Sequence, residues 1–279
     1  MRISSGGSTD VGRVRSNNED SYRIVEPLNL FVLSDGMGGE AHGEVASAIA
    51  VDTIADHCLE AAADHDAPFH GQPLVGWSDH TKRLASAVYL ANQKIFAAAD
   101  RSEERHGMGA TLTAVWIGGN RMSLAHVGDS RAYLLRSGNL QQLTTDHSLV
   151  AEQVRRGILS AAEAERSDMQ NVLLRALGTQ EEVEFETDEH QLIPNDALVI
   201  CSDGLTRMVT EPEIAGTLQA ETDPQKAAEQ LVNLANENGG ADNITVIVVR
   251  LEPDSSKWFS WLRGGARKSK HNGNKPGGH

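Results

Sequence analysis

Short apolar runs that end in glycine-containing turns are the clearest hydrophobic pattern of the chain. Leu30–Leu33 leads into Ser-Asp-Gly at Asp35, and Ala197–Cys201 leads into the same tripeptide at Asp203. Ile244–Leu251 is a third run, rich in β-branched residues. Uninterrupted apolar runs bounded by turn signals are typical of strands buried on both faces. The pattern therefore predicts three buried strands that carry polar turns at their ends.

Apolar residues at helical spacing predict helices between and after these strands. Ala41–Ala63 is rich in alanine, and Ser78–Asp100 places its apolar residues on one face, with Ser78 as a candidate N-cap. Residues 64–77 contain prolines and glycines and are expected to form a loop. Shorter helices are expected at residues 146–157, 160–166, 211–219 and 224–238.

The middle of the chain has the pattern of short strands joined by Gly/Asn turns. Thr111–Ile117, Arg121–Val127 and Arg131–Arg136 predict an antiparallel meander. The turn before the third strand contains a further aspartate, Asp129, in the sequence Gly-Asp-Ser-Arg. Residues 146–178 interrupt the strands with helical sequence, so this insert is expected to form a lid or flap.

Length and cysteine content indicate a globular protein of the cytoplasm. The 279 residues suffice for one large domain or two small ones, and they contain no internal repeat. No segment approaches the roughly 18 consecutive apolar residues of a membrane helix, and the polar start lacks a signal-peptide pattern. Cys58 and Cys201 are too few for a disulfide framework. A cytoplasmic location is therefore expected.

Charge divides the chain into an acidic body and a basic tail. Residues 1–252 carry 19 basic and 38 acidic side chains, whereas residues 253–279 carry six Lys or Arg and one Asp. An acidic body repels phosphate backbones, which argues against nucleic acid as the main partner. We expect one domain over residues 1–252 and a disordered tail, with the small apolar patch Trp258–Leu262 as a possible docking element.

Four aspartates in glycine-containing turns form a candidate site. Each alone is compatible with ordinary turn chemistry. Carboxylates gathered at strand ends repel one another, so a shared site requires a cation. Hard divalent cations such as Mg²⁺ and Mn²⁺ prefer oxygen ligands of this kind. The four residues are Asp35, Asp129, Asp203 and Asp242.

Motifs spread over residues 8–252 are similar to those of a known family. In order, they are Gly12 with Arg15 and Asn18-Glu19-Asp20; Val32-Leu33-Ser34-Asp35-Gly36-Met37-Gly38-Gly39 with Gly43-Glu44; Gly109-Ala110-Thr111-Leu112; His126-Val127-Gly128-Asp129-Ser130-Arg131; Leu143-Thr144-Thr145-Asp146-His147-Ser148; Leu174-Arg175-Ala176-Leu177-Gly178; Ser202-Asp203-Gly204-Leu205; and Gly240-Ala241-Asp242-Asn243. Each motif is weak by itself, but together and in this order they are specific. The chain resembles the metal-dependent PPM (PP2C-like) serine/threonine protein phosphatases, in their bacterial form.

The resemblance implies an α+β fold and a two-metal centre. The fold is a four-layer α-β-β-α sandwich of two antiparallel sheets, with the metals at one end between the sheets. Two Mn²⁺ or Mg²⁺ ions are implied. Asp35 bridges both ions, Asp20 and the Gly36 carbonyl contribute on one side, and Asp203 and Asp242 hold the other. Asp35, Asp203 and Asp242 are then the catalytic set.

Two further residues match positions of the family. Asp129 matches the ligand of a weaker third ion, which it shares with Asp203. Arg15 matches the phosphate-binding arginine, and its planar guanidinium suits phosphate oxygens better than a lysine would.

The implied reaction needs no covalent enzyme intermediate, because the two metal ions supply a hydroxide that attacks phosphorus in line. Cys201 is then expected to belong to the core. Eukaryotic relatives have a histidine, proposed as the general acid, at the position of Met37. Many bacterial relatives have methionine there, as this chain does. Met37 cannot donate a proton, so His42 and His147 become candidates for the general acid. Alternatively, His42 is a residue at the start of a helix, and His147 anchors a loop or flap. His126 is expected to be structural.

Three functions compete for this site. The first is dephosphorylation of phosphoserine and phosphothreonine on proteins, opposing a serine/threonine kinase; a cognate kinase or a forkhead-associated protein is a natural partner, and a monomer is expected. The second is phosphoprotein binding by a non-catalytic relative, which loss of a metal ligand would indicate, and none is lost. The third is a two-metal nuclease, which the charge of the body opposes.

Overall fold

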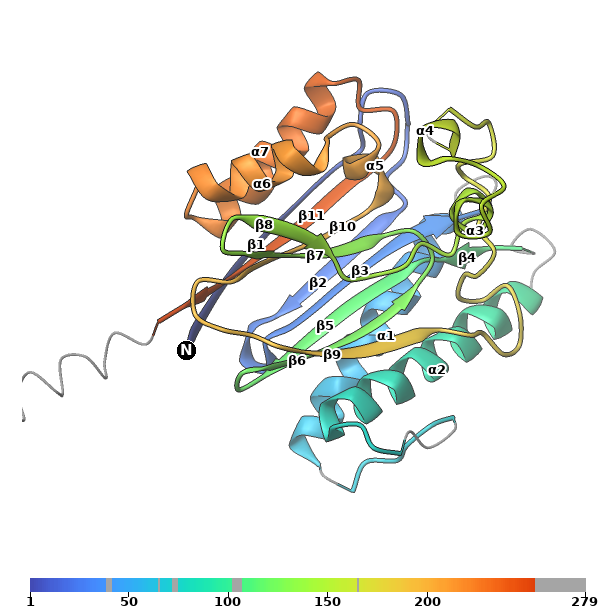
Figure 1. The fold of residues 1–279 in the computed structure, drawn as a ribbon. Helices are drawn as coiled ribbons and strands as arrows, with labels where there is room; N and C mark the ends of the chain where they lie inside the picture. Colours follow the sequence, from blue (N-terminus) through green and yellow to red (C-terminus); the bar gives the residue numbers. More distant parts are fainter. Residues whose placement is uncertain (39–41, 65, 72–74, 102–106, 165, 254–279) are drawn as a thin grey trace, which may run out of the picture.

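Two antiparallel sheets stack face to face, and a pair of helices covers the outer face of each sheet (Figure 1). The structure is a computed structural model that describes residues 1–38, 42–64, 66–71, 75–101, 107–164 and 166–253. The four layers are those that the family resemblance implied. The basic tail and its apolar patch lie outside the described residues.

The first sheet has five strands and carries both ends of the described chain. In order across the sheet they are β1 (Arg2–Asp10), β11 (Ile244–Glu252), β10 (Ala197–Cys201), β7 (Arg131–Arg136) and β8 (Asn139–Gln142). β1 and β11 pair along their whole length, from Arg2 opposite Glu252 to Asp10 opposite Ile244. Helices α6 (Glu211–Ala220) and α7 (Pro224–Glu237) cover the outer face.

The second sheet has six strands. Along its main path they are β2 (Asp20–Val25), β3 (Leu30–Met37), β5 (Leu112–Gly118), β6 (Arg121–Val127) and β9 (Glu186–Gln191), and the short β4 (Gly109–Ala110) pairs with β3. A 3₁₀ turn, η1 (Glu26–Leu28), joins β2 to β3. Helices α1 (Gly43–Ala63) and α2 (Asp79–Asp100) cover this sheet. The predicted N-cap of α2 is confirmed, since the Ser78 hydroxyl accepts a hydrogen bond from the Thr81 N–H at 3.3 Å.

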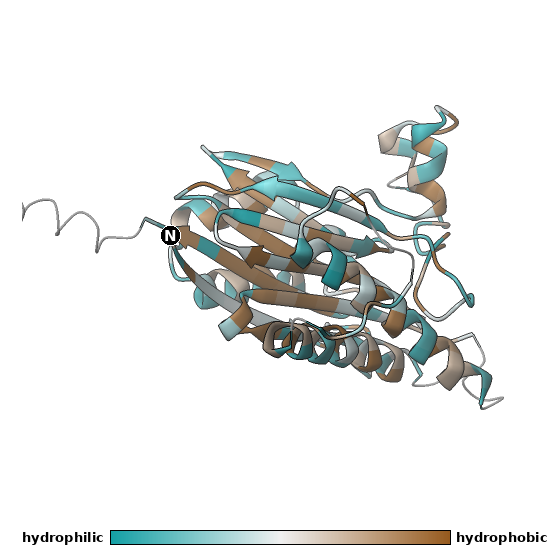
Figure 2. Ribbon diagram, turned by 90° about the horizontal axis from the view of Figure 1, so that it is seen from below, coloured by the Kyte–Doolittle hydropathy of each residue, from teal (hydrophilic) through white to brown (hydrophobic). Residues whose placement is uncertain are grey.

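Alternate residues of β3 enter different cores, which explains its continuous apolar sequence. Leu30 and Val32 pack against α1 and α2, whereas Phe31 and Leu33 lie between the two sheets. This alternation follows from the two-residue period of a strand. Figure 2 shows the resulting brown strands in the interior of the sandwich. Full burial of each such side chain stabilises the fold by about 1.5–3 kcal/mol.

The predicted meander is wrong at its third strand. β5 and β6 form the expected hairpin, but β7 pairs with β8 and β10 in the other sheet. Gly128, at a φ of 103°, begins the turn that carries the chain from one sheet to the other. Asp129 therefore lies at a crossing between the sheets and not inside a hairpin.

The helices of the insert are shorter than the sequence predicted. Among the described residues of 146–157 and 160–166, the helices are α3 (Leu149–Arg155) and α4 (Ala161–Ala164). The hydroxyl of Ser148 caps α3 by accepting from the Ala151 N–H at 3.3 Å. A further short helix, α5 (Asp203–Thr206), follows β10 directly. None of the helices in the described ranges is long and apolar enough to cross a membrane.

Candidate active site

The predicted site residues come together where the ends of both sheets meet. A pocket of about 180 Å³ opens there. Asp20 lies behind its wall, at the start of β2, and is buried. The other predicted residues line it directly: Arg15, Asp35, Gly36, Asp129, Asp203 and Asp242.

Pairing of β2 with β3 sets Asp20 opposite Asp35. The Ser202 hydroxyl, from the other sheet, donates to Oδ2 of Asp20 at 2.7 Å. The Asp35 N–H donates to the Thr111 hydroxyl at 2.9 Å, which fixes the backbone of β3 at the pocket. Gly36 follows at a point where a Cβ would lie 2.0 Å from the Gly43 carbonyl oxygen. The glycine therefore lets α1 approach the end of β3 closely.

A second close approach brings Asp203 and Asp242 to one side of the pocket. A Cβ on Gly204 would lie 2.0 Å from the carbonyl oxygen of Asn243, so only glycine allows α5 to lie against this loop. The Asn243 side chain donates to the carbonyls of Val11 and Asn17, at 3.0 and 2.8 Å. One asparagine thus joins the segment that carries Arg15 to the loop of Asp242.

Burial and mutual repulsion raise the pKa values of these carboxyl groups. Burial, opposed by hydrogen bonds from Thr245 and Ser202, raises the pKa of Asp20 to about 7. Burial and the charge of Asp203 raise the pKa of Asp129 to about 7. Burial and then the charge of Asp20 raise the pKa of Asp35 well above its usual range. Such a cluster favours the binding of positive charge.

The donor set fits a hard divalent cation. Its donors are oxygens only, and Oδ1 of both Asp20 and Asp203 is buried without a hydrogen-bond partner among the described residues. Within that part of the chain, no three His, Cys, Asp or Glu side chains are grouped so that they could hold a metal ion as they stand. Carboxylates that keep unpaired buried oxygens nevertheless suit Mg²⁺ or Mn²⁺, and no cysteine or histidine is among the described residues that line the pocket.

Two charged pocket residues were given no role by sequence reasoning, Glu19 and Arg207. Arg207 pairs with the carboxylates of Asp203 and Asp242. Its position four residues after Asp203 was an available signal, because side chains at that spacing share one face of a helical turn. Glu19 lies beside Asp20 in a polar run, and such a run does not indicate which of its side chains face the pocket.

Neither candidate general acid lines the pocket. His42 occupies the N-cap position of α1 and makes no capping hydrogen bond with its side chain. Nδ1 of His147 accepts from the Gly128 N–H at 3.2 Å, and its Nε2 lies 3.3 Å from Glu186. Met37 does line the pocket, as its place in the motif predicted. Cys201 is fully buried in β10, and burial raises its pKa to about 12.

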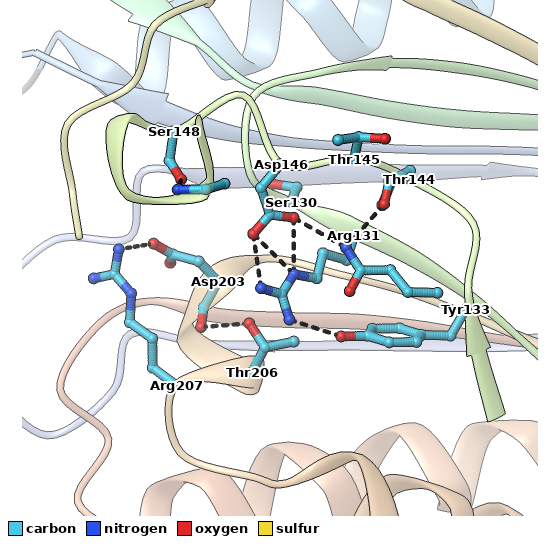
Figure 3. Close-up of polar contacts among 12 residues, drawn as sticks. Ser130, Arg131, Tyr133, Thr144, Thr145, Asp146, Ser148, Asp203, Thr206 and Arg207 are labelled. Carbon is cyan, nitrogen blue, oxygen red and sulfur yellow. Dashed lines mark hydrogen bonds and ion pairs between the residues drawn. The ribbon is translucent and has the colours of Figure 1, made fainter. Parts of the chain in front are cut away.

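An arginine fixes the start of the insert beside the pocket (Figure 3). Arg131 makes a two-pronged pair with Asp146, with contacts of 2.9 and 2.7 Å, and donates to the Tyr133 hydroxyl at 2.9 Å. Asn171 and Leu173 of the insert line the pocket. The segment that begins at Asp146 therefore forms part of the pocket wall.

His126 contacts the residue before this segment through the Thr145 carbonyl, and its burial predicts how stability changes with pH. Burial and then His147 lower its pKa to about 4, although the carbonyls of Leu112 and Thr145 face its two ring nitrogens. As pH falls, the unfolded chain therefore binds a proton first, and the stability present above the unfolded pKa of 6.5 is lost towards pH 4. We expect the wild type to lose up to about 1.4 kcal/mol per pH unit relative to His126→Gln in this window.

Urea unfolding of both proteins at a series of pH values measures this difference. The carboxyl groups of the pocket titrate in both proteins, so their contribution cancels. A difference that does not change with pH would contradict the prediction.

Comparison with known proteins gives the family. A sequence profile described as Protein phosphatase 2C matches residues 12–243. The serine/threonine phosphatase stp of Listeria welshimeri is 38% identical over 244 residues, which are 86% of this chain and 93% of that protein. A crystal structure of the Mycobacterium tuberculosis serine/threonine phosphatase PstP/Ppp matches with a TM-score of 0.79 at 37% identity, covering 90% of this chain and 99% of that chain. The catalytic domain of PstP in complex with two manganese ions matches with a TM-score of 0.77 at 36% identity, over 90% and 99% of the two chains. The chain belongs to the protein phosphatase 2C family.

Proposed function

We propose that this chain is a metal-dependent phosphatase that hydrolyses phosphoserine and phosphothreonine on proteins. The observation that carries the proposal is one pocket that combines a cluster of buried, mutually repelling carboxylates with an arginine. Membership of the family and the names of the relatives support the same activity. Asp20, Asp35, the Gly36 carbonyl, Asp203 and Asp242 would hold two ions, and Asp129 would contribute to a third.

The protein's own residues orient the substrate and exclude a covalent route. Bound Mn²⁺ or Mg²⁺ supplies the activation of water for attack on phosphorus. Arg15, whose side chain is 49% exposed at the pocket, can turn its guanidinium to the oxygens of a phosphate. Cys201 is buried and protonated, so it is no nucleophile. Met37 cannot protonate the leaving alkoxide, and no described pocket residue is a histidine, so that proton would come from metal-bound water, from another side chain or from solvent.

Release of phosphate from phosphoserine and phosphothreonine peptides tests the proposal. We expect turnover with Mn²⁺ or Mg²⁺, its loss on addition of EDTA, and its return with excess metal. Cys201→Ala should keep metal-dependent turnover, since the thiol takes no part. Absence of metal-dependent turnover would refute the proposal, and cleavage of a phosphodiester instead would favour the nuclease.

Roles are also proposed for whole segments of the chain. Residues 1–252 would form the phosphatase domain, and the insert 146–178 would act as a flap, which is supported by Asn171 and Leu173 in the pocket wall. A serine/threonine kinase or a forkhead-associated protein as substrate, a monomeric state and the cytoplasmic location expected from the sequence stay predictions. Phosphoproteomics of a deletion strain would identify the substrates.

A further inference from the structure

Arg207 pairs with Asp203, which the proposed function assigns to cation binding (Figure 3). Its Nη2 pairs with Oδ2 of Asp203, and its Nη1 lies 3.7 Å from Oδ2 of Asp242. The same oxygen of Asp242 accepts a hydrogen bond from Arg15 at 2.9 Å. One guanidinium therefore reaches both aspartates on this side of the pocket.

Local structure holds Arg207 in this position. α5 begins at Asp203, and the Arg207 N–H donates to the Asp203 carbonyl at 2.9 Å, which closes one helical turn. Residues four apart on such a turn lie on the same face, so the arginine side chain returns over the carboxylate of Asp203. Its side chain is only 22% exposed, against 49% for Arg15. Arg207 is thus the more enclosed of the two arginines in the pocket.

A guanidinium and a divalent cation are attracted to the same two carboxylates. The arginine takes up part of the negative charge of Asp203 through Oδ2, and its own positive charge repels an ion bound to the same carboxylate. Oδ1 of Asp203 stays buried and unpaired in the described structure, so the arginine neutralises the carboxylate without satisfying it. The guanidinium of Arg207 and a divalent ion therefore compete for these carboxylates.

We infer that Arg207 is an internal competitor for the cation site, because its positive charge weakens the binding of a divalent ion to Asp203 and Asp242. The inference rests on the proposed function, because it takes these two aspartates as cation ligands. Arg207 then sets the metal concentration at which the site fills. It is a positioning residue for the carboxylates.

Titration of the purified protein with Mn²⁺, followed by calorimetry, tests the inference without any activity measurement. We expect Arg207→Gln to bind Mn²⁺ about tenfold more tightly than the wild type, because the competing charge-assisted contacts are lost. Arg207→Lys keeps the charge but lacks the planar fork, so a smaller tightening of about threefold is expected. Arg156→Gln removes an exposed arginine that pairs with Glu152 on α3, and should leave the affinity unchanged.

Thermal unfolding gives a second measurement. With EDTA present, Arg207→Gln should unfold at a lower temperature than the wild type, because the carboxylates lose a neutralising charge. With saturating Mn²⁺, its unfolding temperature should rise by more than that of the wild type. A role of Arg207 in packing alone would lower the unfolding temperature equally under both conditions.

The outcomes separate this inference from the proposed function. Unchanged or weaker Mn²⁺ binding by Arg207→Gln would overturn the inference. Should that variant fail to fold, Arg207→Lys decides, since unchanged or weaker binding by the lysine variant would overturn it equally. If the wild type binds no Mn²⁺, or if Asp35→Asn leaves Mn²⁺ binding intact, the proposed function fails instead.

Discussion

Asp35→Asn is expected to lower metal-dependent phosphate release by at least about a thousandfold, because the proposed bridging ligand is lost. The same substitution should stabilise the protein in the presence of EDTA. Burial and the neighbouring carboxylates raise the pKa of Asp35, so its charged form is held at a cost that a neutral amide of the same shape avoids. We expect the free energy of unfolding of the variant with EDTA to be higher than that of the wild type.

Opposite effects on activity and stability would mark Asp35 as a functional residue rather than a structural one. Peptide dephosphorylation with Mn²⁺ and urea unfolding with EDTA measure the two effects. Asp100→Asn, an exposed aspartate at the end of α2, is the matched control and should change neither. Retained turnover in Asp35→Asn, or a loss of stability with EDTA, would contradict the interpretation.

Gly204→Ala should have the largest effect on stability among the substitutions considered. The added Cβ would lie 2.0 Å from the carbonyl oxygen of Asn243 and 2.9 Å from its carbonyl carbon, and this backbone cannot turn aside as a flexible side chain could. Overpacking of this kind costs about 1–3 kcal/mol. Because α5 would move away from the loop of Asp242, the two aspartates on that side would separate, and Mn²⁺ binding should weaken with stability.

Gly216→Ala is the matched control for this prediction. Gly216 lies inside α6, where a Cβ would meet nothing within 4 Å. Alanine in a helix interior is favoured over glycine by up to about 1 kcal/mol, so this variant should be slightly more stable and should bind Mn²⁺ normally. Thermal unfolding and calorimetric titration compare the two variants. Equal effects of both substitutions would show that the close approach at Gly204 is not important.

Sequence patterns predicted the buried strands better than the edge strands. β3, β10 and β11 are continuous apolar runs because both of their faces are covered. β1 is rich in glycine and serine, which have low β-propensity, and it is held by nine register pairs to β11. β9 is charged and lies at the edge of its sheet, where charge prevents further pairing. The sequences of such edge strands contain little pattern that predicts a strand, since pairing with the neighbouring strand holds them in place.

The candidate site was predictable as a set of aspartates but not as an arrangement. Glycine-containing turns at strand ends indicated four aspartates, which are Asp35, Asp129, Asp203 and Asp242. The family resemblance added Asp20, the Gly36 carbonyl and Arg15. The close approaches at Gly36 and Gly204 depend on elements far apart in the chain, and no local pattern reveals them. For the same reason, the sequence did not reveal that the chain crosses between the sheets at Gly128. The residues of a tight turn are similar whether or not the strands on its two sides pair with each other.

The pairing of β1 with β11 has a consequence for how the protein can be attached to other molecules. Asp10 and Ile244 lie at the pocket end of this ribbon, whereas Arg2 and Glu252 lie together at the other end. Nine residues of strand span roughly 30 Å. A tag, a surface tether or a fused protein joined at either position would therefore be anchored far from the pocket mouth. Because these two positions are neighbours, a short linker between them, in a variant without residues 253–279, would also permit circular permutation with new ends in an exposed loop.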